Sequence, residues 1–323
     1  MSAVLIVRPS SMGDVVYALA IVADVRRHRP ELAIDWIAEP GFVPLVRMCP
    51  EVRNVIPFAL RRWRRAPFAR ETWRNVRVFR SELRAERYVA ILNLQEQMKG
   101  ALIARVAHGT THGFHRASAR EPLAAWLDDV HHRVDRRRHF IDRVRSLAAA
   151  ALDYSLDAPP AWCLEPPATA PDIPDRPYVV AIHSASRDDK LWPDAHWREL
   201  VANFERAGFT SVLPWGNAVE EARSRRIAEG FASAVVPRFL SLPDVAAMVK
   251  HAELAVGLDT GFTHLSGALG TPTVAIFVST DRARHGVAAT GVRARDLGDA
   301  GSPPSVEQVI AACGQLGRSI PND

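Results

Sequence analysis

The segment 10–14 (Ser-Ser-Met-Gly-Asp) joins an apolar run, 3–7, to a helical pattern that begins near Asp14. Small residues let a ligand approach the backbone, and the free amides at a helix start attract an anion. Asp14 would stand at the mouth of a ligand cleft beyond the ends of the predicted strands, where a carboxylate can act as a general base. The structural alternative is a capping serine followed by an aspartate that offsets the helix dipole.

A comparable segment lies in the second half of the chain. Asp259 follows the predicted strand 253–258, Thr260 and Gly261 open a helix, and His264 follows one turn later. The amides of Thr260 and Gly261 could hold a phosphate at this helix start. The competing interpretation is a capped helix with a core histidine.

Two further loops carry polar side chains at the ends of predicted strands. After the strand 178–183, Ser186, Arg187 and Lys190 could hold phosphate oxygens, with lysine as a point charge and arginine as a fork. After the strand 210–214, Glu220 could take ribose hydroxyls, although glutamates in a first helical turn usually complement the dipole. The adjacent carboxylates at 188–189 lack the partners of a dedicated metal site.

Positive charge is concentrated in the first half. Residues 1–160 hold 26 Lys and Arg against 17 Asp and Glu, a net +9, whereas the remainder has a net −4. The segment 61–65 (Arg-Arg-Trp-Arg-Arg) leads into further arginines at helical spacing. Such a surface suits nucleic acid, an anionic membrane, or a phosphorylated and carboxylated ligand, and a solvated face is the alternative.

Composition narrows the class of protein. Of 323 residues, 48% are hydrophobic and 24% charged, which excludes a disordered, collagen-like or coiled-coil chain. No apolar run approaches the roughly 18 residues of a membrane span. Cys49, Cys163 and Cys313 form no metal spacing, and we expect them to be reduced in a cytoplasmic protein. His131, His132 and His139 have no completing ligands, so no metal site is predicted.

Strands alternate with helices along most of the chain, which predicts an α/β fold with parallel sheets. Segment 114–156 is expected to be mostly helical. We predict an N-terminal domain at 1–160, a linker at 157–177 with seven prolines, a second domain at 178–303, and a C-terminal helix and tail at 304–323 that could pack back on the N-terminal domain. The absence of GxGxxG argues against a dinucleotide-dependent enzyme.

The chain carries an ordered set of motifs along nearly its whole length. The motifs are Ser10-Ser11-Met12-Gly13-Asp14, Arg61-Arg62-Trp63-Arg64, Ala107-His108-Gly109 with His112-Gly113, Ala119-Arg120-Glu121-Pro122-Leu123, Arg187-Asp188-Asp189-Lys190, Trp192-Pro193, His196-Trp197-Arg198-Glu199-Leu200, Leu213-Pro214-Trp215-Gly216, Ala228-Glu229-Gly230-Phe231-Ala232, and Asp259-Thr260-Gly261 with His264-Leu265. With these motifs in this order, the chain resembles the ADP-heptose lipopolysaccharide heptosyltransferases.

The resemblance implies a GT-B fold, with two Rossmann-like domains facing across an interdomain cleft. It implies an inverting, metal-independent and cofactor-free transfer of L-glycero-D-manno-heptose from ADP-heptose to the Kdo of Kdo-lipid A. Such an enzyme would be cytoplasmic and peripheral on the anionic inner face of the inner membrane, and it would bind no nucleic acid.

Matched by position, the resemblance also assigns roles to single residues. Asp14 would be the catalytic base, and Lys190 would offset charge on the leaving group. The donor side would comprise Ser10, Ser11, Gly13, Ser186, Lys190, Glu220, Asp259, Thr260, Gly261 and His264. The acceptor side would comprise Arg61, Arg62, Arg64, Arg65, Arg120, His139 and Arg143.

Departures from the family pattern occur at Arg8-Pro9, at Ala185 and at Val278-Ser279-Thr280. Arg8 stands where the family usually has lysine, and the other two departures concern donor binding. Two other functions remain open at this point. One is a heptosyltransferase whose acceptor already bears a heptose, and the other is a non-catalytic, basic nucleotide-sugar-binding protein.

Overall fold

The computed structural model describes residues 2–287 and 293–316. The chain divides into two compact units, Met1–Glu165 and Pro166–Asp323. The division falls within the proline-rich stretch 157–177, which forms neither helix nor strand.

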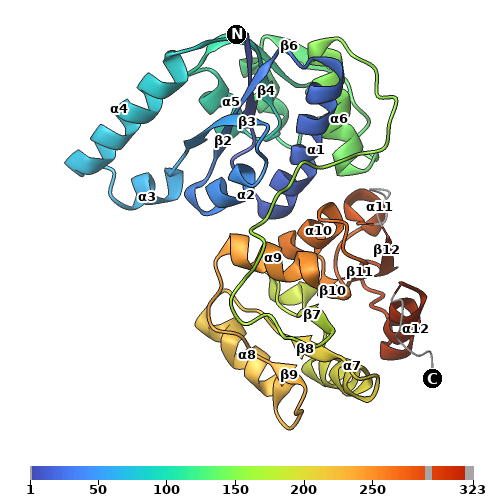
Figure 1. Ribbon diagram of the computed structural model, residues 1–323. Coiled ribbons are helices and arrows are strands. Elements are labelled where there is room, and N and C mark those ends of the chain that lie inside the picture. Colours follow the sequence, from blue (N-terminus) through green and yellow to red (C-terminus); the bar gives the residue numbers. More distant parts are fainter. Residues whose placement is uncertain (1, 288–292, 317–323) are drawn as a thin grey trace. The chain divides into compact units, whose positions relative to one another are not determined.

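The first unit is a six-stranded parallel sheet with helices (Figure 1). Its strands follow the order β3-β2-β1-β4-β5-β6, which is the order of the Rossmann fold. The strands are β1 (Ala3–Val7), β2 (Ala33–Ala38), β3 (Val52–Pro57), β4 (Arg87–Asn93), β5 (His108–Phe114) and β6 (Val130–His132). The helices are α1 (Met12–His28), η1 (Pro40–Phe42), α2 (Val43–Arg47), α3 (Leu60–Arg65), α4 (Arg70–Arg84), α5 (Met98–Ala104), η2 (Pro122–Leu127) and α6 (Phe140–Leu152).

The second unit repeats this architecture, with the order β12-β11-β10-β7-β8-β9 and all strands parallel. Counted from β7, this is the same strand order as in the first unit. The strands are β7 (Tyr178–Ile182), β8 (Thr210–Val212), β9 (Ala234–Val235), β10 (Leu254–Leu258), β11 (Thr273–Phe277) and β12 (Ala294–Gly298). The helices are η3 (Asp188–Lys190), α7 (Asp194–Arg206), α8 (Ala218–Ala228), α9 (Leu242–His251), α10 (Gly261–Ala268), α11 (Arg282–His285) and α12 (Val306–Leu316).

The central strands are apolar because helices cover both faces of a parallel sheet. Every residue of β1, β7, β10 and β11 is buried. In the first unit, helices α1 and α6 are also joined by a buried ion pair. Arg145 Nε and Nη2 donate to the two carboxylate oxygens of Asp24, each at 2.8 Å.

The prediction that 114–156 is mostly helical was wrong for its first part. Strand β5 ends at Phe114, and β6 lies at Val130–His132; of this segment only η2 and α6 are helical. Strand β5 (His-Gly-Thr-Thr-His-Gly-Phe) lacks the apolar pattern of a buried strand. Its Gly113 is required by packing, because a Cβ there would lie 1.8 Å from Asp128 Oδ2.

The C-terminal helix α12 packs on the second unit. Val306, Val309 and Cys313 are buried in the same core as strands β7, β10 and β11. Its apolar face is therefore covered within this unit. The suggestion that the C-terminal helix and tail pack back on the N-terminal domain stays a prediction. The tail 317–323 lies outside the described residues.

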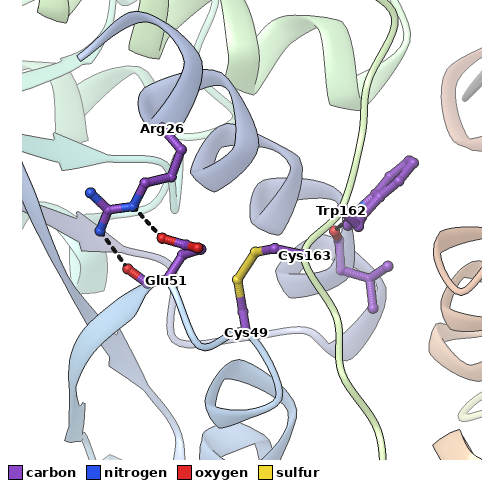
Figure 2. Close-up of a disulfide and its surroundings, with 6 residues drawn as sticks. Arg26, Cys49, Glu51, Trp162 and Cys163 are labelled. Atoms are coloured by element: carbon purple, nitrogen blue, oxygen red, sulfur yellow. Dashed lines mark hydrogen bonds and ion pairs between the residues drawn. A yellow bond between two sulfur atoms is a disulfide. The ribbon is translucent and has the colours of Figure 1, made fainter. Parts of the chain in front are cut away.

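A disulfide joins Cys49 to Cys163, and this corrects the expectation of three reduced cysteines (Figure 2). The bond attaches the start of the proline-rich stretch to the loop between α2 and β3. Two hydrogen bonds support the attachment: Trp162 Nε1 donates to the carbonyl of Val16 at 2.8 Å, and the Glu165 amide donates to the carbonyl of Met48 at 2.6 Å. Cys313 is buried and unpaired with another cysteine.

Within the described ranges, no helix combines the length and the apolar character that crossing a bilayer requires.

Candidate functional site

Each sheet has one topological switch point, where the connections of neighbouring strands turn in opposite directions. In open α/β sheets, ligands bind beyond the carboxyl ends of the strands at such a point. In the first unit it lies between β1 and β4, and in the second between β7 and β10. The loop after β1 carries the 10–14 segment, and the loops after β7 and β10 carry Lys190 and Asp259.

At the first switch point, three donors converge on one carboxylate oxygen. Asp14 Oδ2 accepts from Arg8 Nη2 at 2.6 Å, from Ser11 Oγ at 2.8 Å and from the Ser11 amide at 3.1 Å. Ser11 and Asp14 form a capping box at the start of α1. The side chain of Asp14 is 26% exposed, so the carboxylate is held in place yet remains accessible.

Electrostatics favour the charged form of this carboxylate. Burial would raise the pKa of Asp14, but the charge of Arg8 and the hydrogen bonds from Ser11 outweigh burial, so the pKa lies below its usual value. Asp14 is therefore ionised near neutral pH, the state that a general base requires.

Lys99 of α5 brings a second cation to this loop. Its Nζ donates to Ser10 Oγ at 3.0 Å. Burial lowers the pKa of Lys99, opposed by the nearby carboxylate of Glu39. Glu39 in turn pairs with Arg61 Nε at 3.2 Å, which connects the α3 arginines to the loop that holds Asp14. Gly13 lies half-buried in the first turn of α1.

The predicted acceptor residues fall into two groups. Arg61, Arg62, Arg64 and Arg65 lie exposed on α3, around a Trp63 that is buried against Phe58 and Phe79. Arg120 is also exposed.

The second group, His139 and Arg143, is buried. His139 caps α6, its Nδ1 accepting from the Ile141 amide at 3.3 Å, and its ring meets the edge of Tyr17 in α1. Arg143 pairs with Glu96 at 2.9 Å and donates to the carbonyl of Ser118 at 2.7 Å. These contacts of the two terminal nitrogens of Arg143 brace α6 against the loops after β4 and β5, so the side chain takes part in the internal packing of this unit.

At the second switch point, Lys190 meets Asp259. Lys190 Nζ donates to Asp259 Oδ2 at 2.6 Å, and His264 Nε2 lies 3.1 Å from Asp259 Oδ1. Thr280 Oγ1 donates to Asp259 Oδ2 at 2.7 Å. Burial opposes ionisation of Asp259, but His264 and Lys190 outweigh it and hold the pKa well below its usual range. The site is thus a cation beside a firmly ionised carboxylate.

The start of α10 lies beside this group. Thr260 is the N-cap, and its hydroxyl accepts from the Phe262 amide at 3.3 Å. Gly261, the first helical residue, is half-buried. The preceding strand approaches α10 closely at Gly257, where a Cβ would lie 2.2 Å from Thr263 Oγ1. Lys190 and this helix start form a combination suited to an anion.

Glu220 and Ser186 are placed differently. Glu220 accepts from the Gly216 amide and from Asn217 Nδ2, each at 2.8 Å, and so closes the loop before α8. Ser186 is exposed in the loop after β7. His183, which precedes it, is buried; burial lowers its pKa to about 3, and its Nε2 lies 2.7 Å from Ser224 Oγ.

The sequence analysis did not assign roles to Arg8 and Thr280, which contact Asp14 and Asp259. Both follow a buried strand, at the end where ligands bind, and that position was the available signal. Across residues 2–287 and 293–316, no cluster of three His, Cys, Asp or Glu residues suitable for a metal ion occurs.

Known proteins provide an independent comparison. The model of glycosyltransferase family 9 (heptosyltransferase) matches residues 76–308. The chain is 38% identical to lipopolysaccharide heptosyltransferase 1 of Escherichia coli K12 over 281 residues, 86% of this chain and 88% of the relative. It is 37% identical to lipopolysaccharide heptosyltransferase 1 of Pseudomonas aeruginosa, covering 86% of this chain and 79% of that protein.

Solved structures agree. The structure of the E. coli heptosyltransferase WaaC with ADP is similar with a TM-score of 0.88 and 33% identity, covering 98% of this chain and 100% of that one. The WaaC structure with ADP-2-deoxy-2-fluoro heptose gives a TM-score of 0.84 at 35% identity, covering 97% and 98%. The predicted α/β fold of the GT-B type is confirmed. The chain belongs to glycosyltransferase family 9, the heptosyltransferases, and is a glycosyltransferase.

Proposed function

We propose that the chain transfers L-glycero-D-manno-heptose from ADP-heptose to the Kdo of Kdo-lipid A, in assembly of the lipopolysaccharide inner core. The observation that carries this proposal is the 38% identity to lipopolysaccharide heptosyltransferase 1 in a chain that keeps an ionised Asp14 at its first switch point. In this proposal the reaction uses no cofactor and no metal: ADP-heptose is the activated donor, and Lys190 and the start of α10 offset the charge of its diphosphate.

In the proposed mechanism, Asp14 accepts the proton of the attacking Kdo hydroxyl, which is otherwise a poor nucleophile. The oxygen attacks the anomeric carbon of the heptose as its bond to ADP breaks on the opposite face, so the configuration inverts. The exposed arginines of α3 and Arg120 suit the carboxylates and phosphates of the acceptor, because a guanidinium forms paired hydrogen bonds with such groups.

The donor is assigned to the second unit. Lys190 and the start of α10 offset the negative charge that grows on the departing diphosphate. Lys190 Nζ already donates to Asp259, the residue that follows β10, so the ammonium group is held in place before the donor binds. Glu220 accepts hydrogen bonds from the ribose hydroxyls, and Asp259, with His264 beside it, lies near the sugar.

Product analysis tests this function. Purified protein should release ADP when it receives ADP-heptose and Kdo-lipid A, and the lipid should gain the mass of one heptose. With an acceptor that already bears one heptose, the protein should release little ADP from ADP-heptose. The reverse preference would instead assign the chain to the next heptosyl transfer, and ADP-heptose binding without ADP release would indicate a non-catalytic binding protein.

The same proposal includes peripheral binding to an anionic membrane through the surface formed by α3 and α4. Phe68, between the two helices, is 92% exposed, and Trp73 is 55% exposed. Trp73, Arg77, Arg80 and Arg84 recur at steps of four, three and four residues, and so lie along one side of α4. Aromatic side chains beside arginines are typical of elements that lie in a bilayer interface.

Vesicle binding tests this part. Replacing both Phe68 and Trp73 with serine should weaken binding to vesicles containing anionic lipid by at least about tenfold, because each buried aromatic is worth about 1.5–3 kcal/mol. Phe239→Ser, which removes an aromatic that is 60% exposed in the second unit, is the matched control and should leave binding unchanged. Equal binding by the double variant and the control would refute this surface as the membrane contact.

A further inference from the structure

Arg8 is buried and contacts Asp14, the candidate base. It is 4% exposed, its Nη1 donates to the carbonyl of Leu94, and its guanidinium lies 4.8 Å from the centre of the Phe140 ring. Its own carbonyl accepts from Trp36 Nε1 at 3.2 Å, which fixes the backbone at the end of β1. A charged side chain is costly to bury, and among the described residues Arg8 has one carboxylate partner, Asp14, so this pairing calls for an explanation.

Helix capping does not supply that explanation. Helix α9 begins with the same capping box, in which Asp244 Oδ2 accepts from Ser241 Oγ at 2.6 Å and from the Ser241 amide at 3.1 Å. Asp244 has no cationic partner among the described residues. A Ser-x-x-Asp cap in this chain therefore forms without a buried arginine, and Arg8 adds something that the cap does not need.

The two carboxylate oxygens of Asp14 differ in their contacts. Arg8 and both donors of Ser11 bind Oδ2, whereas Oδ1 has no donor within the described part of the chain. Arg8 also links the two loops at the switch point between β1 and β4. Its Nη1 donates to the carbonyl of Leu94, which follows β4, and its Nη2 contacts Asp14, which follows β1. A guanidinium can make both contacts at once, which the single ammonium of a lysine cannot do in the same geometry.

The other charged groups near this carboxylate are farther from it. Lys99 of α5 contacts Ser10 rather than Asp14, and Glu39 and Arg61 act on Lys99. Of the cations in the described ranges, Arg8 is therefore the one that contacts Asp14, and its removal most directly changes this carboxylate.

We infer that Arg8 is a positioning residue for the heptosyl transfer: it holds Oδ2 of Asp14 so that Oδ1 stays free to take the proton of the acceptor hydroxyl. The inference rests on the proposed function. In this arrangement one carboxylate oxygen is a fixed structural acceptor and the other is the reactive atom.

The pH dependence of kcat/KM distinguishes positioning from a purely structural role. Without Arg8, burial of Asp14 is no longer offset by a neighbouring charge, so the pKa of Asp14 rises. In Arg8→Met, the acid limb of the profile should therefore move to higher pH by about one unit or more. Arg8→Lys restores the charge and should return the limb toward that of the unsubstituted enzyme, while kcat stays reduced because one of the two contacts is lost.

A double-mutant cycle completes the test. If Arg8 acts through Asp14, Arg8→Met should reduce kcat far less in an Asp14→Asn background than in the unsubstituted enzyme. Equal losses in both backgrounds, or an acid limb that stays in place in Arg8→Met, would overturn the inference while leaving the proposed function intact. Full activity of Asp14→Asn alone would instead refute Asp14 as the base, and the inference with it.

Discussion

Asp14→Asn is expected to lower kcat for heptose transfer by about 10²–10⁴-fold, the usual contribution of a general base. Asparagine keeps an oxygen that can accept from Ser11, so the start of α1 should still be capped. It cannot take a proton from the acceptor hydroxyl. Steady-state ADP release at saturating ADP-heptose and Kdo-lipid A measures the loss.

The chain offers a matched control for this substitution. Asp244→Asn alters the same capping box at the start of α9, away from either switch point. If Asp14 serves only as a helix cap, the two variants should lose similar stability and neither should lose much activity. If it is the base, only Asp14→Asn should lose turnover. Comparable activity of the two variants would contradict the proposed mechanism.

Lys190→Met is expected to lower kcat by about 10²–10³-fold, since a single group that stabilises the charge developing in the transition state contributes about 2.7–4 kcal/mol. The loss should appear in turnover more than in the affinity for the acceptor, because Lys190 is assigned to the donor. Asp259 would keep His264 and Thr280 as partners, so the second unit should remain folded. Steady-state ADP release at varied concentrations of Kdo-lipid A measures turnover and the KM for the acceptor separately.

Lys250→Met is the control for this second variant. Lys250 is an exposed lysine of the same unit, and its Nζ donates to the carbonyl of Leu269 at 2.7 Å. Removing it should affect stability but not turnover. If Lys190→Met released ADP as fast as Lys250→Met, Lys190 would have no role in the departure of the diphosphate.

Much of this fold can be predicted from the sequence because its central strands are short apolar runs between helical patterns. Strand β1 and the loop to Asp14 follow directly from such a run, and so do β10 and Asp259. Strand β5 could not be predicted in this way. It pairs beside β4 with a polar, glycine-containing sequence whose fit depends on Asp128, a contact that only the folded structure provides.

The candidate site can likewise be predicted from the sequence only in part. Residue type and spacing indicate which loops carry Asp14, Lys190 and Asp259. They do not indicate which partner each side chain selects, because Arg8 reaches Asp14 and Thr280 reaches Asp259 only when the chain has folded. Burial is equally invisible in sequence: Arg143 looks like a surface cation in a basic segment, yet it is 2% exposed and paired with Glu96.

The disulfide has a consequence for how the two units share stability. Cys49 and Cys163 are 114 residues apart, so the bond closes most of the first unit into one covalent loop. In the chain-entropy view, such a loop restricts the unfolded chain by about 5 kcal/mol. That contribution belongs to the first unit alone, since Cys313 of the second unit is buried as a thiol whose pKa burial raises. A reductant therefore acts on the half assigned to the acceptor and spares the half assigned to the donor.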